Sequence, residues 1–237
     1  MSTYELKHFP SDVELASTAA YDFVARLESA SRTGKPFFVA LSGGRITKQF
    51  FNFTVEEIKR RNVSPGFVHF FWADERCVGP DHPDSNFLLA NDLLFKPLNI
   101  KAENIHRLRG ELPAHKAISE ANAELEQLAG MHPVLDLVLL GMGEDGHVAS
   151  LFPNATEATI KEIAPFLSIN NSPKPPPDRL SLSFAALAAA RDVWILASGK
   201  GKEEALRHSL QPKTIATPLA RVLQSRQQSR IYTDIAL

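Results

Sequence analysis

Residues 135–147 read LDLVLLGMGEDGH, in which a short apolar run ends in a turn rich in glycine. An apolar run of this length that ends in a turn is typical of a strand buried on both faces of a sheet. The segments PFFVAL (36–41) and FVHFFW (67–72) have the same form, the first followed by Ser-Gly-Gly and the second by charged residues. The sequence therefore predicts a sheet of buried parallel strands.

Helical patterns lie between these runs. Ser11 and Glu14 form a capping box, and apolar residues then recur at helical spacing until Gly34. Further helices are expected over 47–60, 86–95 (stopped by Pro97), 114–129 and 202–210, with a short one opened by Pro218, and further strands over 163–169, 179–184, 193–197 and 230–233. This alternation predicts an α/β fold of three layers, a mostly parallel sheet flanked by helices on both faces. No repeat or flexible linker interrupts it, so residues 1–237 are expected to form a single domain.

Composition limits the possible partners. The chain has 237 residues, with 26 Lys and Arg against 27 Asp and Glu, and a formal charge of −1. The whole molecule therefore has no attraction to nucleic acid or acidic membranes, and an anionic ligand requires a local cluster of cations. The single cysteine, Cys77, allows no intramolecular disulfide, and charged residues interrupt the two most apolar segments, at Asp136 and at Arg191 and Asp192. We expect a cytoplasmic protein that binds neither nucleic acid nor membranes.

Ligands of open parallel sheets bind beyond the carboxyl ends of the strands, so the turns at those ends are the candidate sites. In LSGGR (41–45), Gly43 and Gly44 let the backbone bend and expose N–H groups, and the positive end of the next helix points to the same place. These features are typical of a phosphate-binding turn. A tight turn without a ligand explains the two glycines equally well.

The strand at 67–72 is followed by the charged triplet Asp74, Glu75 and Arg76. A solvated charge run explains most such triplets, and a functional site is the alternative. The polar loop that follows contains possible metal ligands in Cys77, Asp81, His82 and Asp84. Their spacing matches no zinc or calcium loop, so no metal is expected.

The turn GMGEDGH (141–147) contains the strongest candidate for chemistry. Its glycines let the backbone approach a ligand, and His147 can accept and return a proton near neutral pH. A lone histidine is more often structural than catalytic. Its position after Asp145, at the end of a buried strand, favours acid–base catalysis.

Cationic residues gather in the second half of the chain. Lys174 and Arg179 flank a proline-rich loop, and Lys200 and Lys202 open a helix after the strand at 193–197. Singly, each is an ordinary surface charge, but together with the Ser-Gly-Gly turn they indicate a phosphorylated small molecule. The chain lacks the G-x-S-x-G of serine hydrolases, and GMGEDG is a weak match to a dinucleotide-binding turn.

Several of these segments resemble 6-phosphogluconolactonases, in the family that also contains the glucosamine-6-phosphate isomerases. They are SGG (42–44), WADERCVGPDHPDSN (72–86), IHRLRGE (105–111), DLVLLGMGEDGHVASLFP (136–153), SPKPPPDR (172–179) and GKGKEEAL (199–206). The resemblance implies a Rossmann-like sheet of the deaminase/lactonase type. It also implies hydrolysis of 6-phospho-D-glucono-1,5-lactone to 6-phospho-D-gluconate in the oxidative branch of the pentose phosphate pathway, without a metal or organic cofactor.

The same resemblance suggests roles for the candidate residues. His147 is expected to take a proton from a water that attacks C1 and then to protonate the ring oxygen, with either Asp145 or Asp74 orienting the imidazole. N–H groups of the GMGEDG turn are the candidate donors to the oxyanion. Activity should then fall below about pH 6.5, the pKa of free histidine. The residues expected to bind substrate are Ser42, Gly43, Gly44, Arg45, Arg76, Arg179 and Lys202, and the protein is expected to be a monomer or weak homo-oligomer.

The chain departs from the family pattern after the Ser-Gly-Gly turn. The family usually continues with Ser-Thr-Pro, whereas this chain has Arg45, Ile46 and Thr47. Two hydroxyl positions are therefore replaced, and Arg45 offers a charge and Thr47 one hydroxyl in their place.

Two alternative functions differ from lactone hydrolysis. Glucosamine-6-phosphate deaminases typically carry Asn-Glu-Pro where this chain has Leu-Phe-Pro (151–153). Isomerisation requires additional acid–base groups, so Phe152 in place of a carboxylate disfavours a deaminase. The other alternative is a non-catalytic sugar-phosphate sensor, which the presence of Asp145 and His147 disfavours.

Overall fold

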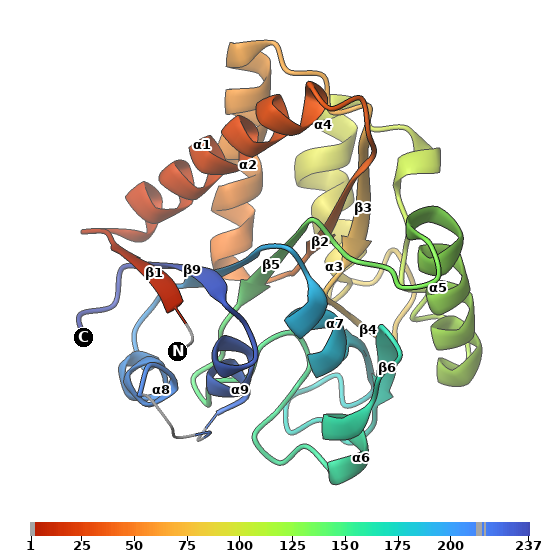
Figure 1. Cartoon of the computed structure of the whole chain (residues 1–237), viewed down its shortest axis with the longest axis vertical. Helices are drawn as coiled ribbons and strands as arrows, with labels where there is room; N and C mark the ends of the chain where they lie inside the picture. Colours follow the sequence, from red (N-terminus) through yellow and green to blue (C-terminus); the bar gives the residue numbers. More distant parts are fainter. Residues whose placement is uncertain (1–2, 212–214, 216) are drawn as a thin grey trace.

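The computed structural model describes residues 3–211, 215 and 217–237, and within them the strands form two sheets (Figure 1). The main sheet is parallel and has the order β1 (Thr3–His8), β9 (Gln228–Thr233), β8 (Val193–Ala197), β5 (Leu137–Gly141), β2 (Phe37–Leu41) and β3 (Val68–Trp72). The smaller sheet is antiparallel, with the order β4 (Asp74–Arg76), β7 (Arg179–Leu182) and β6 (Phe166–Ile169).

Helices cover both faces of the main sheet. In Figure 1, α1 and α2 lie on one side of it, and α7, α8 and α9 lie on the other. The bounds are α1 (Asp12–Ser31), α2 (Arg45–Arg61), α3 (Asn86–Ala90), α4 (Lys96–Leu98), α5 (Ala114–Ala129), α6 (Glu157–Lys161), α7 (Phe184–Ala189), α8 (Glu203–Ser209) and α9 (Pro218–Gln224). The three-layer α/β fold predicted from the sequence is confirmed.

The apolar runs form the core because the helices bury both faces of these strands. All of β8 and all but the last residue of β5 are buried. Trp72 and Trp194, at 1% exposure each, are the largest of the enclosed side chains. Burial of this kind is the main favourable contribution to folding and gives the turns beyond the strands a rigid base.

The structure corrects several expectations. The strands expected near 163–169 and 179–184 are β6 and β7, which pair with β4 in the antiparallel sheet instead of extending the parallel one. Strand β1 was not predicted, because it is an edge strand whose residues are mostly exposed and polar. Pro97 does not stop the helix that begins at Asn86, because a π-helical turn (Asn91–Phe95) leads into α4, which ends at Leu98 and is capped by Asn99 with φ 51°.

The order of the strands places a switch point between β2 and β5. The chain leaves β2 toward β3 on one side of the sheet, and it leaves β5 toward β8 on the other side. In open α/β sheets such a reversal leaves a crevice at the carboxyl ends of the two strands, where ligands bind. The turns LSGGR and GMGEDGH follow these two strands, so the fold brings them together.

Candidate active site

The turn after β2 exposes the start of α2. Gly44 has a φ of 112°, a region that favours glycine, and no side chain caps the first turn of the helix. A Cβ on Gly43 would lie 1.9 Å from Oδ1 of Asn86, so only glycine fits there. The unfilled N–H groups of α2 are therefore available to an anion.

Asp74 and Glu75 are held in a buried network behind the pocket. Asp74 accepts hydrogen bonds from the Ser150 hydroxyl (2.7 Å) and from the side-chain amide of Asn86 (3.2 Å). Glu75 accepts from the backbone N–H groups of Asn86 and Phe87, each at 2.8 Å, at the start of α3. Glu75 therefore anchors α3, while Asp74 remains at the pocket wall.

The turn after β5 positions an imidazole–carboxylate pair. Nδ1 of His147 lies 2.5 Å from Oδ1 of Asp145, and the ring of Phe152 packs against the imidazole at 4.6 Å between centroids. No contact of this kind joins Asp74 to the His147 ring within the described residues. The geometry therefore pairs His147 with Asp145, which lies behind the imidazole, rather than with Asp74.

The environment of His147 favours its neutral form. Burial lowers the pKa of His147 below its ordinary value, and the positive charge of Lys174 acts in the same direction, while Asp145 and Asp74 oppose both effects. Burial alone would raise the pKa of Asp145, but the hydrogen bond and charge of His147 outweigh it, so this pKa is lowered. The pair is therefore a carboxylate and a neutral imidazole near pH 7, which is the form a general base requires.

The substitution Gly143→Ala tests this geometry. The new Cβ would lie 2.0 Å from Nδ1 of His147 and 2.7 Å from Oδ1 of Asp145, so the pair must move. Misplacement of a catalytic group by about 1 Å costs roughly 100-fold in rate, and we expect a loss of that size in kcat. Gly79→Ala is the matched control, because no atom lies within 4 Å of its added Cβ. Equal kcat values for the two variants would contradict the geometry.

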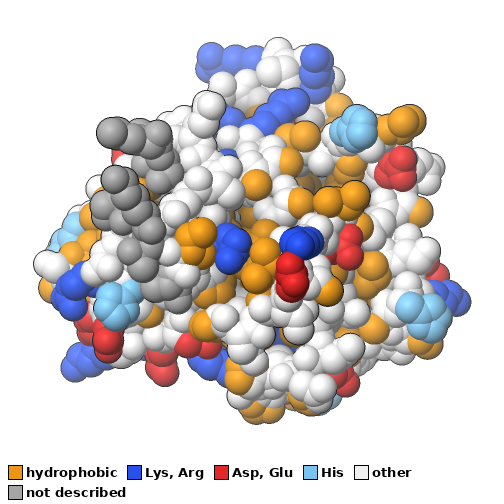
Figure 2. Space-filling model, turned by 60° about the horizontal axis from the view of Figure 1, so that its bottom comes forward, with side chains coloured by type: hydrophobic (Ala, Val, Ile, Leu, Met, Phe, Trp, Pro, Cys, Tyr) orange, Lys and Arg blue, Asp and Glu red, His pale blue; other side chains and the backbone are white. Residues whose placement is uncertain are grey.

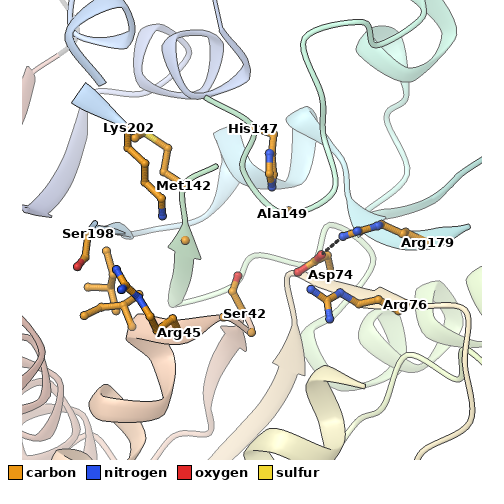
Figure 3. Close-up of a pocket in the computed structure, with 15 residues that line it drawn as sticks. Ser42, Arg45, Asp74, Arg76, Met142, His147, Ala149, Arg179, Ser198 and Lys202 are labelled. Atoms are coloured by element: carbon orange, nitrogen blue, oxygen red, sulfur yellow. Dashed lines mark ion pairs between the residues drawn. The ribbon is translucent and has the colours of Figure 1, made fainter. Parts of the chain in front are cut away.

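One pocket collects nine of the ten residues to which the resemblance gives a catalytic or substrate-binding role. It is a cavity of about 170 Å³ whose lining contains Ser42, Gly43, Gly44, Arg45, Asp74, Arg76, His147, Arg179 and Lys202, and of these ten only Asp145 is outside. Figure 2 turns the side with the carboxyl ends of the strands forward, and Lys and Arg side chains lie near the middle of that face. In Figure 3, Arg45 and Lys202 reach in from one side, Arg76 and Asp74 from the other, and His147 from above.

The cations around the pocket differ in how strongly they are engaged. Arg179 is 4% exposed, and most of its donors bind backbone carbonyls of the proline-rich loop. Burial lowers the pKa of Lys202, and the charge of Arg45 adds to this effect. A doubly negative phosphate would relieve the repulsion between Arg45 and Lys202. Lys200, by contrast, is exposed and does not line the pocket.

Two expected hydrogen-bonding roles change in the structure. The hydroxyl of Thr47 donates to the carbonyl of Gly43 at 3.0 Å and is buried, so it does not line the pocket. In the GMGEDG turn, the N–H of Gly143 donates to the carbonyl of His147 and that of Gly146 donates to the carbonyl of Gly143. These two N–H groups are therefore engaged within the turn.

Sequence reasoning missed residues that support the site. Asn86 joins Asp74 to the Gly43 turn, Ser150 donates to Asp74, and Ser198 lines the pocket and donates to Asp234 at 2.9 Å. Asn86 and Ser150 lie inside the segments 72–86 and 136–153, and Ser198 follows strand β8. Membership of these segments, and for Ser198 the position after a strand, were usable signals, but their partners are distant in sequence.

Neither a metal site nor a membrane-spanning helix is found in the described part of the chain. Nowhere in residues 3–211, 215 and 217–237 do three or more His, Cys, Asp or Glu side chains gather as a metal site requires. In the same residues, no helix combines the length and apolar character of a bilayer span.

The fold and the pocket define a class of protein. A parallel sheet, a cation-lined pocket at its switch point and a neutral imidazole in that pocket are typical of an α/β enzyme for a small anionic substrate. The chain belongs to the family described as glucosamine-6-phosphate isomerases/6-phosphogluconolactonase, whose pattern matches residues 10–232.

Within this family the similarity extends over nearly the whole chain. A 6-phosphogluconolactonase from Aggregatibacter actinomycetemcomitans is 31% identical over 228 residues, which cover 95% of this chain and 95% of that protein. The crystal structure of 6-phosphogluconolactonase from Thermotoga maritima has a TM-score of 0.83 at 26% identity, covering 98% of this chain and 99% of the other. A monomeric glucosamine-6-phosphate deaminase has a TM-score of 0.82 at 18% identity, covering 97% and 96%, which shows a common fold alone.

Proposed function

We propose that this chain hydrolyses 6-phospho-D-glucono-1,5-lactone to 6-phospho-D-gluconate, the lactonase step of the oxidative pentose phosphate pathway. The observation that carries the proposal is the convergence of His147, Arg45 and Lys202 on one pocket at the switch point of the sheet. The 31% identity to a full-length 6-phosphogluconolactonase supports the same reaction. The substrate is thus a phosphorylated sugar lactone.

The phosphate is assigned to the end of the pocket that contains the start of α2. There the N–H groups beyond Gly44, together with Arg45 and Lys202, supply donors and positive charge to a dianion. Binding at this end places the lactone ring toward His147. Such anchoring of a remote group converts part of the binding energy into orientation at the reacting carbon.

The chemistry requires one base that then acts as an acid. The neutral imidazole of His147 removes a proton from water as the oxygen of that water bonds to C1, and the carbonyl oxygen becomes an oxyanion. When the tetrahedral intermediate collapses, the bond from C1 to the ring oxygen breaks, and the imidazolium returns the proton to that oxygen. Asp145 holds the ring of His147 through Nδ1 and stabilises the transient imidazolium.

The oxyanion needs a hydrogen-bond donor from the pocket wall, and we assign this role to Arg76. Arg76 lines the pocket next to Asp74, and its Nη1 donates to the Asp84 carbonyl at 2.5 Å. The other donors of the Arg76 guanidinium can then stabilise the oxyanion in place of the N–H groups of Gly143 and Gly146, which are engaged within the turn.

The pH profile of kcat/KM tests the role of the base, because kcat/KM reports the pKa of a base in the free enzyme. Burial lowers the pKa of His147, so the imidazole stays neutral to a lower pH than free histidine. Since the base acts when it is unprotonated, kcat/KM should persist below pH 6.5 before it falls. Proton release at lactone concentrations well below KM, corrected for spontaneous opening, measures the profile. A kcat/KM that does not change across the acidic range would exclude His147 as the base.

The reaction itself is tested on lactone generated in place by glucose-6-phosphate dehydrogenase. We expect its decay rate to rise in proportion to the concentration of this protein, above the spontaneous rate. The deaminase alternative predicts ammonia release from glucosamine 6-phosphate instead. We expect none, because the apolar ring of Phe152 packs on His147 at the position where a deaminase typically has a carboxylate. Tight binding of 6-phosphogluconate without turnover of the lactone would support a sensor.

We further propose that the chain works in the cytoplasm as a monomer or weak homo-oligomer. Burial raises the pKa of the single cysteine, Cys77, to about 11, so its thiol is unreactive and suits a reducing compartment. Cell fractionation and sedimentation of the purified protein test the two statements.

A further inference from the structure

The proline-rich loop before β7 is fixed to the active site by a buried arginine. Nε of Arg179 donates to the carbonyl of Pro176 at 3.1 Å, and Nη2 donates to the carbonyls of Lys174 and Pro175 at 3.1 and 3.2 Å. The remaining nitrogen, Nη1, lies 3.9 Å from Oδ2 of Asp74. Arg179 thus connects the backbone around Lys174 to the wall of the pocket.

A second set of bonds fixes the same backbone from the other side. The hydroxyl of Ser172 donates to the carbonyl of Lys174 at 3.0 Å and accepts from its N–H at 3.2 Å. The N–H of Ser172 donates to the carbonyl of Pro177 at 2.8 Å, which closes the loop on itself. The main chain of Lys174 is therefore held at both its N–H and its carbonyl.

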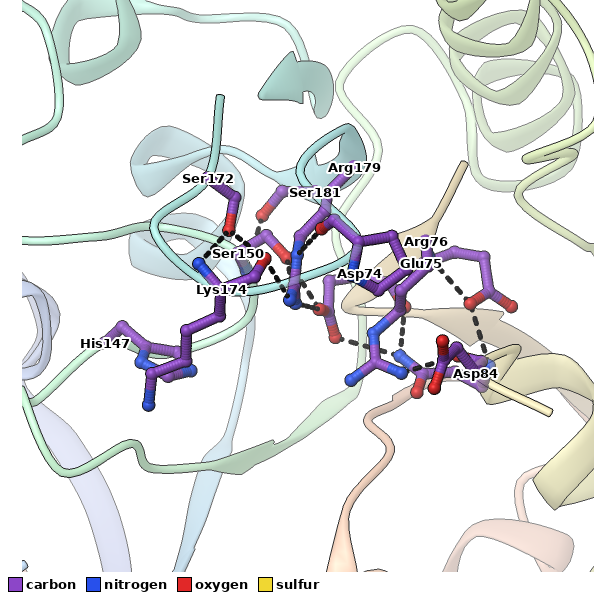
Figure 4. Close-up of polar contacts among 12 residues, drawn as sticks. Asp74, Glu75, Arg76, Asp84, His147, Ser150, Ser172, Lys174, Arg179 and Ser181 are labelled. Atoms are coloured by element: carbon purple, nitrogen blue, oxygen red, sulfur yellow. Dashed lines mark hydrogen bonds and ion pairs between the residues drawn. The ribbon is translucent and has the colours of Figure 1, made fainter. Parts of the chain in front are cut away.

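The side chain of Lys174 is directed toward the catalytic turn. Figure 4 shows it extending from the loop to the neighbourhood of His147, away from Arg179. Within the described residues its ammonium forms no hydrogen bond or ion pair, although the side chain is half-buried. This placement of the Lys174 ammonium does not stabilise the fold, because the charge is partly desolvated and has no partner.

We propose that Lys174 is a further residue of the active site, which acts through His147 and which Arg179 holds in position. This inference rests on the proposed lactonase function. It also gives Arg179 a role different from direct binding of phosphate, since most of its donors are engaged by the loop. Lys174 itself does not line the pocket and is therefore an electrostatic, not a substrate-contacting, residue.

The physical effect of Lys174 is repulsion of a second positive charge. An ammonium near the imidazole disfavours the imidazolium, whereas Asp145 and Asp74 favour it, and burial disfavours it most. The other charged groups around the ring are the pocket cations, namely Arg45, Arg76, Arg179 and Lys202. The charge of Lys174 also lowers the pKa of Lys202, and it adds to the positive field at the phosphate end of the pocket.

The test compares Lys174→Met with Lys174→Arg. Loss of the charge should raise the pKa of His147, so the acid limb of the kcat/KM profile should move to higher pH by roughly half a unit. At pH 7 and above, kcat should remain near that of the wild type, while KM rises several-fold. Lys174→Arg should restore the position of the limb, and Lys200→Met, an exposed lysine outside the pocket, should not move it.

Combination with Arg179→Lys tests the positioning role, because lysine keeps the positive charge but cannot form all three bonds to the loop carbonyls. If Arg179 acts through Lys174, Arg179→Lys should shift the acid limb in the wild-type background and add no shift to Lys174→Met. Because Arg179 is buried, thermal unfolding of each variant is measured first. If Arg179→Lys does not fold, the two Lys174 variants still decide the inference.

An acid limb that stays in place in Lys174→Met, or that Lys174→Arg does not restore, would overturn the inference. Absence of lactone hydrolysis by the wild-type protein is a different result, because it would overturn the proposed function.

Discussion

His147→Ala is expected to lower kcat for lactone hydrolysis by about 10²- to 10⁴-fold, the usual contribution of a positioned general base and acid. In the proposed mechanism the imidazole both removes a proton from water and returns it to the ring oxygen, and Asp145 cannot replace it because its carboxylate lies behind the ring. KM should change little, since the phosphate is assigned to the other end of the pocket. Steady-state kinetics above the spontaneous rate measure both parameters.

The matched control for this substitution is His115→Ala. His115 is an exposed histidine on α5, outside the pocket, so its loss should leave kcat unchanged. The ring of His147 also packs against Phe152, so the thermal unfolding of both variants must be compared before their rates. A folded His147→Ala variant with wild-type kcat would remove the base from the mechanism.

Lys202→Met is expected to have the second-largest effect. A charge-assisted hydrogen bond contributes about 1.5–3 kcal/mol, which corresponds to a loss of about 10- to 150-fold in kcat/KM for the phosphorylated lactone. Because Lys202 is assigned to the phosphate and not to the carbonyl, hydrolysis of unphosphorylated glucono-1,5-lactone should be unaffected. Measurement of kcat/KM for the two lactones separates these outcomes.

Lys200→Met is the control for this second substitution. Lys200 lies two residues away and does not line the pocket, and its substitution removes the same charge. Both lactones should therefore react as with the wild-type protein. If Lys202→Met slows both lactones equally, Lys202 does not act on the phosphate. If Lys200→Met reproduces its effect, long-range charge rather than contact is responsible.

The main sheet could be predicted because its strands are apolar runs that must be buried on both faces. Strands β2, β3, β5 and β8 are found within one or two residues of the predicted runs. The small sheet could not be predicted in the same way. Strand β4 is the triplet Asp74–Arg76, which has no apolar periodicity, and its pairing with β7 joins segments about a hundred residues apart. Non-local pairing of short polar strands leaves no pattern in a single sequence.

Most of the candidate residues could be predicted because they follow strands, but their partners could not. Asp145 and Asp74 were equal candidates to orient His147, and only the distance of 2.5 Å to Asp145 distinguishes them. Arg179 was expected to bind phosphate, and it also holds the loop that contains Lys174. Proximity of this kind depends on the conformation of loops, which residue types alone do not determine.

The most direct test of the central claim is a crystal structure with 6-phosphogluconate bound. We predict that the phosphate lies against the start of α2, in contact with Arg45 and Lys202. The C1 carboxylate of the ligand should lie within hydrogen-bonding distance of His147, directly or through one water. A phosphate bound elsewhere, or a C1 carboxylate on the side of the pocket away from the imidazole, would contradict the account.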